Sequence, residues 1–170
     1  PLYSSAASDV YKRQVDVVVL AVKPQVLKGV AQHLAQTIEE RRPLVVSIAA
    51  GVSQSSLSTW LGENAAIVRC MPNTPALVLT GATGLHANMN VSDPQRDLAE
   101  NILRAVGIAL WVQTESELDA VTAVSGSGPA YYFLLMEAME KTAIELGLKA
   151  ETAQLPVSYT HLTLPTNREV

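Results

Sequence analysis

The sequence predicts an α/β fold in which a doubly wound parallel sheet is followed by helices alone. Short runs of apolar and β-branched residues, typical of parallel strands covered on both faces, alternate with segments of helical periodicity. After residue 117 the strand pattern stops and only helical periodicity continues. Strands that alternate with helices favour a parallel sheet, in which ligands bind outside the carboxyl ends of the strands.

Each element of this pattern has its own signal. The predicted strands are residues 15–22, 44–49, 66–71, 82–87 and 108–113. Apolar residues with a period of about 3.6 predict a helix over 25–40, and Ser53 is suited to cap a second helix over 54–61. Ser92-Asp93-Pro94-Gln95 matches a capping box that opens a third helix, which ends near Val106.

The composition limits the classes of protein to consider. With 170 residues, 48% hydrophobic residues and a net charge of −4, the chain is typical of a globular protein without a basic surface for nucleic acid. It lacks both a signal-peptide pattern and the run of about 18 apolar residues that a membrane helix needs, so we expect a cytoplasmic protein with no membrane partner. Cys70 is the only cysteine and lies in an apolar run, which predicts a buried structural thiol.

The two ends of the sequence look foreign to the rest. Residues 4–14 can be encoded by DNA whose reverse complement, in another frame, encodes residues 157–166, and this DNA resembles a transposase-type sequencing adaptor. We therefore treat residues 1–14 and 156–170 as adaptor-like artefact, and reason about the fold from the residues between them.

Within the remaining sequence we predict an α/β domain over 15–117 and the start of a helical domain over 118–155. A long helix over Pro129–Leu146 has a stripe that needs a partner surface. The stripe consists of Tyr132, Met136, Met139, Ala143 and Leu146. The preceding Val124–Tyr131, VSGSGPAY, is not a dinucleotide fingerprint, because the third glycine would fall at Tyr131 and no buried strand precedes it. We predict that it is a junction between the two domains.

The loops that follow the first three strands contain the candidate binding residues. They have the small residues and prolines expected where backbone approaches a flat ligand. Lys23 fits a contact to cofactor phosphate or ribose oxygens and equally fits a solvated lysine, and Asn73 fits turn chemistry slightly better than ligand binding.

Glu115, Glu117 and Asp119 are interpreted as the solvated first turn of a helix rather than a metal or acid–base cluster. His33 and His86 have no ligand-spaced neighbour and are interpreted as structural, so no metal site is expected.

Taken together, four motifs resemble a known family. AVKP, VSIAAGV, VRCMPNTPALV and AVSGSGPAYYFLLMEAM, in this order and spacing, resemble pyrroline-5-carboxylate reductase over Val15–Leu155. The resemblance implies the C-terminal part of a Rossmann-type cofactor-binding domain, followed by the first helices of an all-α dimerisation domain. It also implies NADPH or NADH as cofactor, 1-pyrroline-5-carboxylate as substrate, L-proline as product, and a homodimer or higher homo-oligomer formed through the C-terminal helices.

The same resemblance implies which residues contact the cofactor. They are Ala21, Val22, Lys23, Pro24, Ile48, Ala49, Ala50 and Asn73. The family's glycine-rich phosphate loop would lie before Val15 and its substrate-carboxylate segment beyond Leu155, so no catalytic residue is assigned and the chain as given is expected to be inactive. Two alternatives stay open. One is a 3-hydroxyacid-dehydrogenase-like reductase, but those enzymes have a lysine at the position of Tyr132, which argues against it. The other is a non-catalytic helical oligomerisation or binding module.

Overall fold

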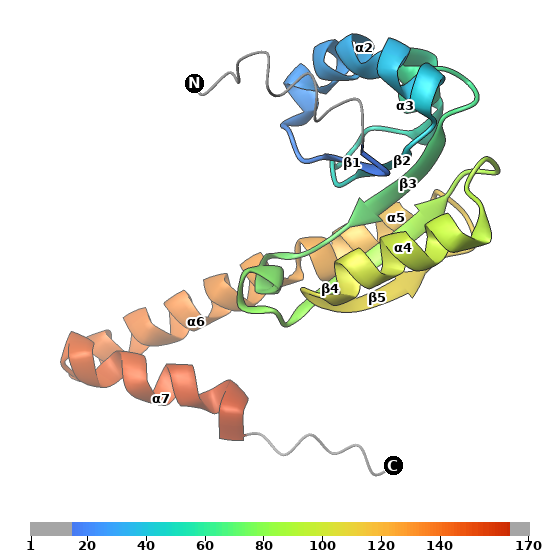
Figure 1. Cartoon of the computed structure of the whole chain (residues 1–170). Helices are drawn as coiled ribbons and strands as arrows, with labels where there is room; N and C mark the ends of the chain where they lie inside the picture. Colours follow the sequence, from blue (N-terminus) through green and yellow to red (C-terminus); the bar gives the residue numbers. More distant parts are fainter. Residues whose placement is uncertain (1–14, 164–170) are drawn as a thin grey trace. The chain divides into compact units, whose positions relative to one another are not determined.

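The computed structural model describes residues 15–163 (Figure 1). The chain divides into two compact units, one up to Gly126 and one from Ser127 onward. The first unit is a sheet with its helices, and the second is a pair of helices. The predicted adaptor-like segment 1–14 and the last part of the second one lie outside the described residues. No helix in the described part is long and apolar enough to cross a membrane.

The first unit contains a five-stranded sheet whose spatial order follows the sequence. Its strands are β1 (Val17–Leu20), β2 (Leu44–Ser47), β3 (Ala66–Met71), β4 (Gly81–Ala87) and β5 (Gly107–Trp111). Pairs β1–β2, β2–β3 and β4–β5 are parallel. The predicted α/β fold class is thus confirmed, and each predicted strand is present, with shorter bounds in most cases.

One pairing corrects the expectation of a parallel sheet. Strands β3 and β4 are antiparallel, with Val68 opposite Ala87 and Met71 opposite Gly84. Only residues 72–80 connect them, and they form the short 3-10 helix η1 (Thr74–Val78). A parallel neighbour requires a crossover of roughly a dozen residues or more, so a connection of this length must return antiparallel.

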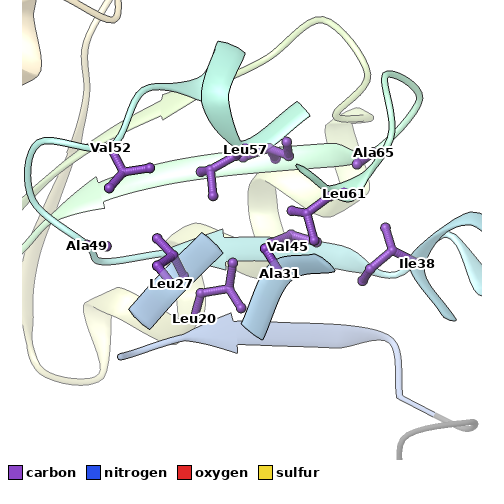
Figure 2. Close-up of a cluster of buried hydrophobic side chains, with 11 residues drawn as sticks. Leu20, Leu27, Ala31, Ile38, Val45, Ala49, Val52, Leu57, Leu61 and Ala65 are labelled. Atoms are coloured by element: carbon purple, nitrogen blue, oxygen red, sulfur yellow. The ribbon is translucent and has the colours of Figure 1, made fainter. Parts of the chain in front are cut away.

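Helices cover both faces of the sheet, as a doubly wound fold requires. Helices α2 (Pro24–Arg41) and α3 (Gln54–Leu61) pack on one face, where Leu27, Leu57 and Val45 of β2 belong to one buried cluster (Figure 2). Helix α4 (Asp93–Arg104) packs on the other face. The core on that side contains Leu44, Val46, Ala66, Val68, Cys70, Leu85, Ala99 and Leu103.

The antiparallel return explains why α4 changes face. Crossover connections between parallel strands are almost always right-handed. The connections β1–α2–β2 and β4–α4–β5 advance across the sheet in the same direction, but β4 and β5 run opposite to β1 and β2. Two right-handed crossovers of this kind must place their helices on opposite faces.

The predicted helix starts are confirmed. The Ser53 hydroxyl accepts a hydrogen bond from the Ser56 backbone N–H at 3.2 Å and caps α3. In the capping box before α4, the Ser92 backbone N–H donates to Gln95 Oε1 at 3.0 Å. Both signals are contained within four successive residues, which is why the sequence alone reveals them.

The helical part of the chain begins with α5 (Glu117–Val121) and a π-helical turn, η2 (Thr122–Gly126), both within the first unit. The second unit contains α6 (Gly128–Glu145) and α7 (Ala150–Thr163). Gly147, at φ +102°, ends the long helix as predicted. The division at Gly126 lies later than the predicted domain boundary at residues 117 and 118, and that boundary stays a prediction.

Two glycines of the first unit should respond oppositely to alanine. Gly107 has φ +150°, and a Cβ there would collide with the Gly81 carbonyl of the paired strand, so Gly107→Ala should cost about 2–4 kcal/mol of unfolding free energy. Gly29 lies inside α2 with open space around its Cα, so Gly29→Ala should stabilise by up to about 1 kcal/mol. Urea unfolding of both variants measures this, and equal effects would contradict the strand register.

Candidate functional site

Three loops leave the sheet from the same edge. In the parallel register Leu20 lies opposite Ser47, and Ser47 lies opposite Arg69, so β1, β2 and β3 end close together. The Ile48 backbone N–H also donates to the Leu20 carbonyl at 3.2 Å, which ties the second loop to the first strand. All the residues predicted to contact a cofactor come from these loops. They are Ala21, Val22, Lys23, Pro24, Ile48, Ala49, Ala50 and Asn73.

The first loop leads directly into the N-terminus of α2. Lys23 is the N-cap residue and is exposed, and Pro24 occupies the first helical turn. The helix has 18 residues, and a helix N-terminus carries partial positive charge and unpaired backbone N–H groups. An ammonium group beside such a terminus suits an anionic ligand such as a phosphate.

The second loop is shaped by small residues. Ser47 is 2% exposed, and its hydroxyl accepts a hydrogen bond from the Ala49 N–H at 3.4 Å. Ala49 is buried, whereas Ala50 is exposed at the loop surface. Gly51 adopts φ +73°, which a residue with a side chain rarely does. The short side chains leave the backbone of this loop accessible to a flat ligand.

The third loop is held by the side chain of Asn73. Its Oδ1 accepts a hydrogen bond from the Ala82 backbone N–H at 2.8 Å, and its Nδ2 donates to Ser125 Oγ at 3.4 Å. Both polar atoms of the Asn73 side chain are therefore engaged inside the first unit, which is consistent with the turn chemistry that the sequence suggested. Its assignment as a cofactor contact stays a prediction.

A polar cluster beside the second loop was not predicted from the sequence. The Arg69 guanidinium pairs with the Glu115 carboxylate, which also accepts a hydrogen bond from the Gln54 backbone N–H at 2.6 Å. Glu115 is therefore a half-buried ion-pair partner that precedes the helix, whereas Glu117 and Asp119 lie exposed in the first turn of α5, as interpreted from the sequence. Together with Gly51, Ser53, Ser116 and Asp119, the ion pair lines a hollow of about 340 Å³.

Two further expectations are confirmed at β3 and β4. Cys70 is buried, and burial raises the pKa of its thiol to about 12, so the thiol stays protonated at neutral pH. His86 is structural, because its Nδ1 shares a hydrogen bond with Gln54 Oε1 at 3.1 Å. The Gln54 amide also donates to the carbonyls of Ile67 and His86. Within residues 15–163, no group of three or more His, Cys, Asp or Glu side chains is arranged to hold a metal ion.

The family model and the curated relatives point to the same family. A family model described as pyrroline-5-carboxylate reductase dimerisation matches residues 115–164. A pyrroline-5-carboxylate reductase of Pseudomonas aeruginosa is 58% identical over 138 residues, which are 81% of this chain and 50% of that protein. The chain thus spans about half the length of the curated relatives that it matches.

Solved structures with the same fold support this relation. A pyrroline-5-carboxylate reductase from Coxiella burnetii is 49% identical, with a TM-score of 0.81 over 88% of this chain and 56% of that one. A Plasmodium falciparum pyrroline carboxylate reductase, solved with NADP bound, is 31% identical, with a TM-score of 0.85 over 94% of this chain and 60% of that one.

The role of Glu115 can be tested by a neutral substitution. Glu115→Gln should lower the free energy of unfolding by about 1–3 kcal/mol, because the Arg69 guanidinium, whose side chain is 11% exposed, would lose its counter-charge. Asp119→Asn, at an exposed carboxylate in the same segment, should change it by less than about 0.5 kcal/mol. Denaturant unfolding of both variants measures the difference, and equal losses would contradict a specific role for Glu115.

Proposed function

Because the aligned part of the chain belongs to the pyrroline-5-carboxylate reductase family, we propose that the complete protein reduces 1-pyrroline-5-carboxylate to L-proline with NADPH or NADH. The observation that carries the proposal is the 58% identity to the Pseudomonas aeruginosa reductase over 138 residues. This identity favours the imine reductase over the 3-hydroxyacid-dehydrogenase-like alternative. The proposal includes a cytoplasmic location.

The residues at the carboxyl edge of the sheet fit a dinucleotide. Exposed Lys23 at the start of an 18-residue helix supplies positive charge for phosphate oxygens, and the loop around Ala50 and Gly51 lets a flat group approach the backbone. We assign Ala21, Val22, Lys23, Pro24, Ile48, Ala49 and Ala50 to cofactor contact.

In the proposed reaction, the main task of the protein is to orient the cofactor and the imine relative to each other. The reduced nicotinamide supplies a hydride, and a protonated cyclic imine already accepts hydride readily. The loops of this chain would hold the two reactants in reach of each other and exclude water, which lowers the entropic part of the barrier. The in-register ends of β1 and β2 keep the first two loops fixed for this purpose.

The direct test is NADPH consumption by the complete purified protein with 1-pyrroline-5-carboxylate. Turnover that depends on both reactants and yields proline is expected. Absence of turnover by a folded protein with both cofactors would refute the proposed activity.

In the same assay, Lys23→Gln should raise the KM for NADPH about tenfold and change kcat less, since a charge-assisted hydrogen bond to phosphate or ribose oxygens contributes about 1.5–3 kcal/mol. Lys28→Gln is the matched control, because Lys28 is an exposed lysine of the same helix but lies beyond its first turn. If both variants raise the KM equally, the effect is one of general charge and not of a contact by Lys23.

We also propose that the complete protein is a homodimer or higher homo-oligomer assembled through α6 and α7. The family model for dimerisation covers both helices. Three successive large side chains of α6 are between 64% and 72% exposed, which is unusual for a contiguous apolar patch. They are Tyr132, Phe133 and Leu134. Met139 and Leu146 line an apolar hollow of about 390 Å³ on the same helix.

A charge on the predicted stripe should weaken assembly. Met139→Glu should raise the dissociation constant at least about 100-fold, because a carboxylate would be buried without a partner. Lys141→Gln changes the net charge by the same amount at an exposed position that pairs with Glu137, and it should leave assembly intact. Light scattering after size-exclusion chromatography distinguishes the two. Unchanged assembly in both variants would place the interface elsewhere.

A further inference from the structure

The amide of Asn73 fixes the hydrogen-bonding direction of a second residue, Ser125. The Ala82 backbone N–H can only donate, so the Asn73 atom that it meets at 2.8 Å must be the acceptor Oδ1. The amide Nδ2 therefore faces Ser125 and donates to its Oγ at 3.4 Å. Because this bond uses Ser125 Oγ as an acceptor, the hydroxyl hydrogen of Ser125 remains available for donation. No other hydrogen bond of this hydroxyl is recorded within the described residues.

A second contact holds the same turn against the end of β3. A Cβ added to Gly126 would lie 2.7 Å from the terminal methyl carbon of Met71, so this methionine packs directly on the glycine backbone. Met71 and Asn73 thus hold two successive residues of the π turn, Gly126 and Ser125. Turns of this widened kind occur frequently at functional sites, and here the turn is fixed to the loop that follows β3.

We propose that Asn73 is a positioning residue that holds the π turn Thr122–Gly126 against the end of β3 and keeps the Ser125 hydroxyl as a donor to an acceptor oxygen of the bound reactants. The inference rests on the proposed reductase function. Both reactants carry such an oxygen: the carboxamide of the nicotinamide and the carboxylate of the cyclic imine. On this view Asn73 affects the reaction through Ser125 and does not contact the cofactor with its side chain.

Exchanging donor and acceptor in the hydrogen bond between Asn73 and Ser125 tests this role. Asn73→Asp keeps an acceptor for the Ala82 N–H but presents a second acceptor to Ser125, whose hydroxyl hydrogen would then turn toward the carboxylate. Ser125→Ala removes the hydroxyl altogether. Each change should lower kcat/KM of the complete enzyme roughly tenfold, since each removes the same hydrogen bond to a reactant.

The double variant decides between positioning and direct contact. If Asn73 acts through Ser125, adding Asn73→Asp to Ser125→Ala should lower kcat/KM by less than about twofold further. A further loss of roughly tenfold would overturn the proposal and indicate a direct contact by Asn73. The matched control is Asn101→Asp, the same change at an exposed asparagine of α4, which should leave kcat/KM unchanged.

The two KM values identify the reactant that Ser125 meets. A rise in the KM for NADPH with Ser125→Ala points to the carboxamide, and a rise in the KM for 1-pyrroline-5-carboxylate points to the carboxylate. If Ser125→Ala leaves kcat and both KM values unchanged, the donor role is refuted.

A structural measurement keeps the test independent of activity. Hydrogen–deuterium exchange of the backbone amides at residues 122–126 should become faster in Asn73→Ala than in wild type, because the turn loses its hydrogen-bonded support. Unchanged exchange would overturn the positioning role, whatever the enzyme's activity. Faster exchange in a protein that does not reduce 1-pyrroline-5-carboxylate would refute the proposed function and support the positioning of the turn.

Discussion

The burial of β2 on both faces is the constraint on which the first unit depends. Val45 packs under α2 and α3, whereas Leu44 and Val46 face α4, and each of these side chains is 0% exposed. A strand buried in this way can satisfy its backbone only through both neighbours, which fixes the register with β1 and β3. That register places the three loops of the candidate site at one edge. The geometry of the site is therefore a consequence of core packing.

The short connection between β3 and β4 has two structural consequences. Since residues 72–80 are too few for a crossover, β4 returns antiparallel, and α4 must then cover the opposite face of the sheet. The same return brings the Ala82 backbone N–H beside Asn73, which orients the amide toward Ser125. The length of this loop thus determines which face of the sheet α4 covers. It also determines the hydrogen bonding at the edge where the candidate ligand would lie.

The features that the sequence reveals are local ones. Caps such as Ser53 and Ser92 involve residues within one helical turn, and apolar runs identify strands without reference to their neighbours. The ion pair between Arg69 and Glu115 spans 46 residues, and no spacing rule connects its members. An arginine inside the apolar run of β3 nevertheless signals that a buried partner must exist, since such a charge is rarely left unpaired. The antiparallel return could also have been inferred from the length of its loop. The three loops and Lys23 could be singled out from the residues, whereas the full set of cofactor contacts is implied only by the resemblance to a family.

The long helix α6 has a wider apolar surface than its helical periodicity predicts. The sequence predicted one stripe, yet the five successive residues 131–135 are all large, apolar and between 57% and 72% exposed. Successive residues of an α-helix are about 100° apart, so five of them encircle it. A helical stretch that is apolar all round is stable only when it is enclosed, and among the described elements α7 is the one with which α6 makes most of its contacts. Partner helices on several sides would be needed to cover residues 131–135 of α6, so that assembly and the folding of the second unit would depend on each other.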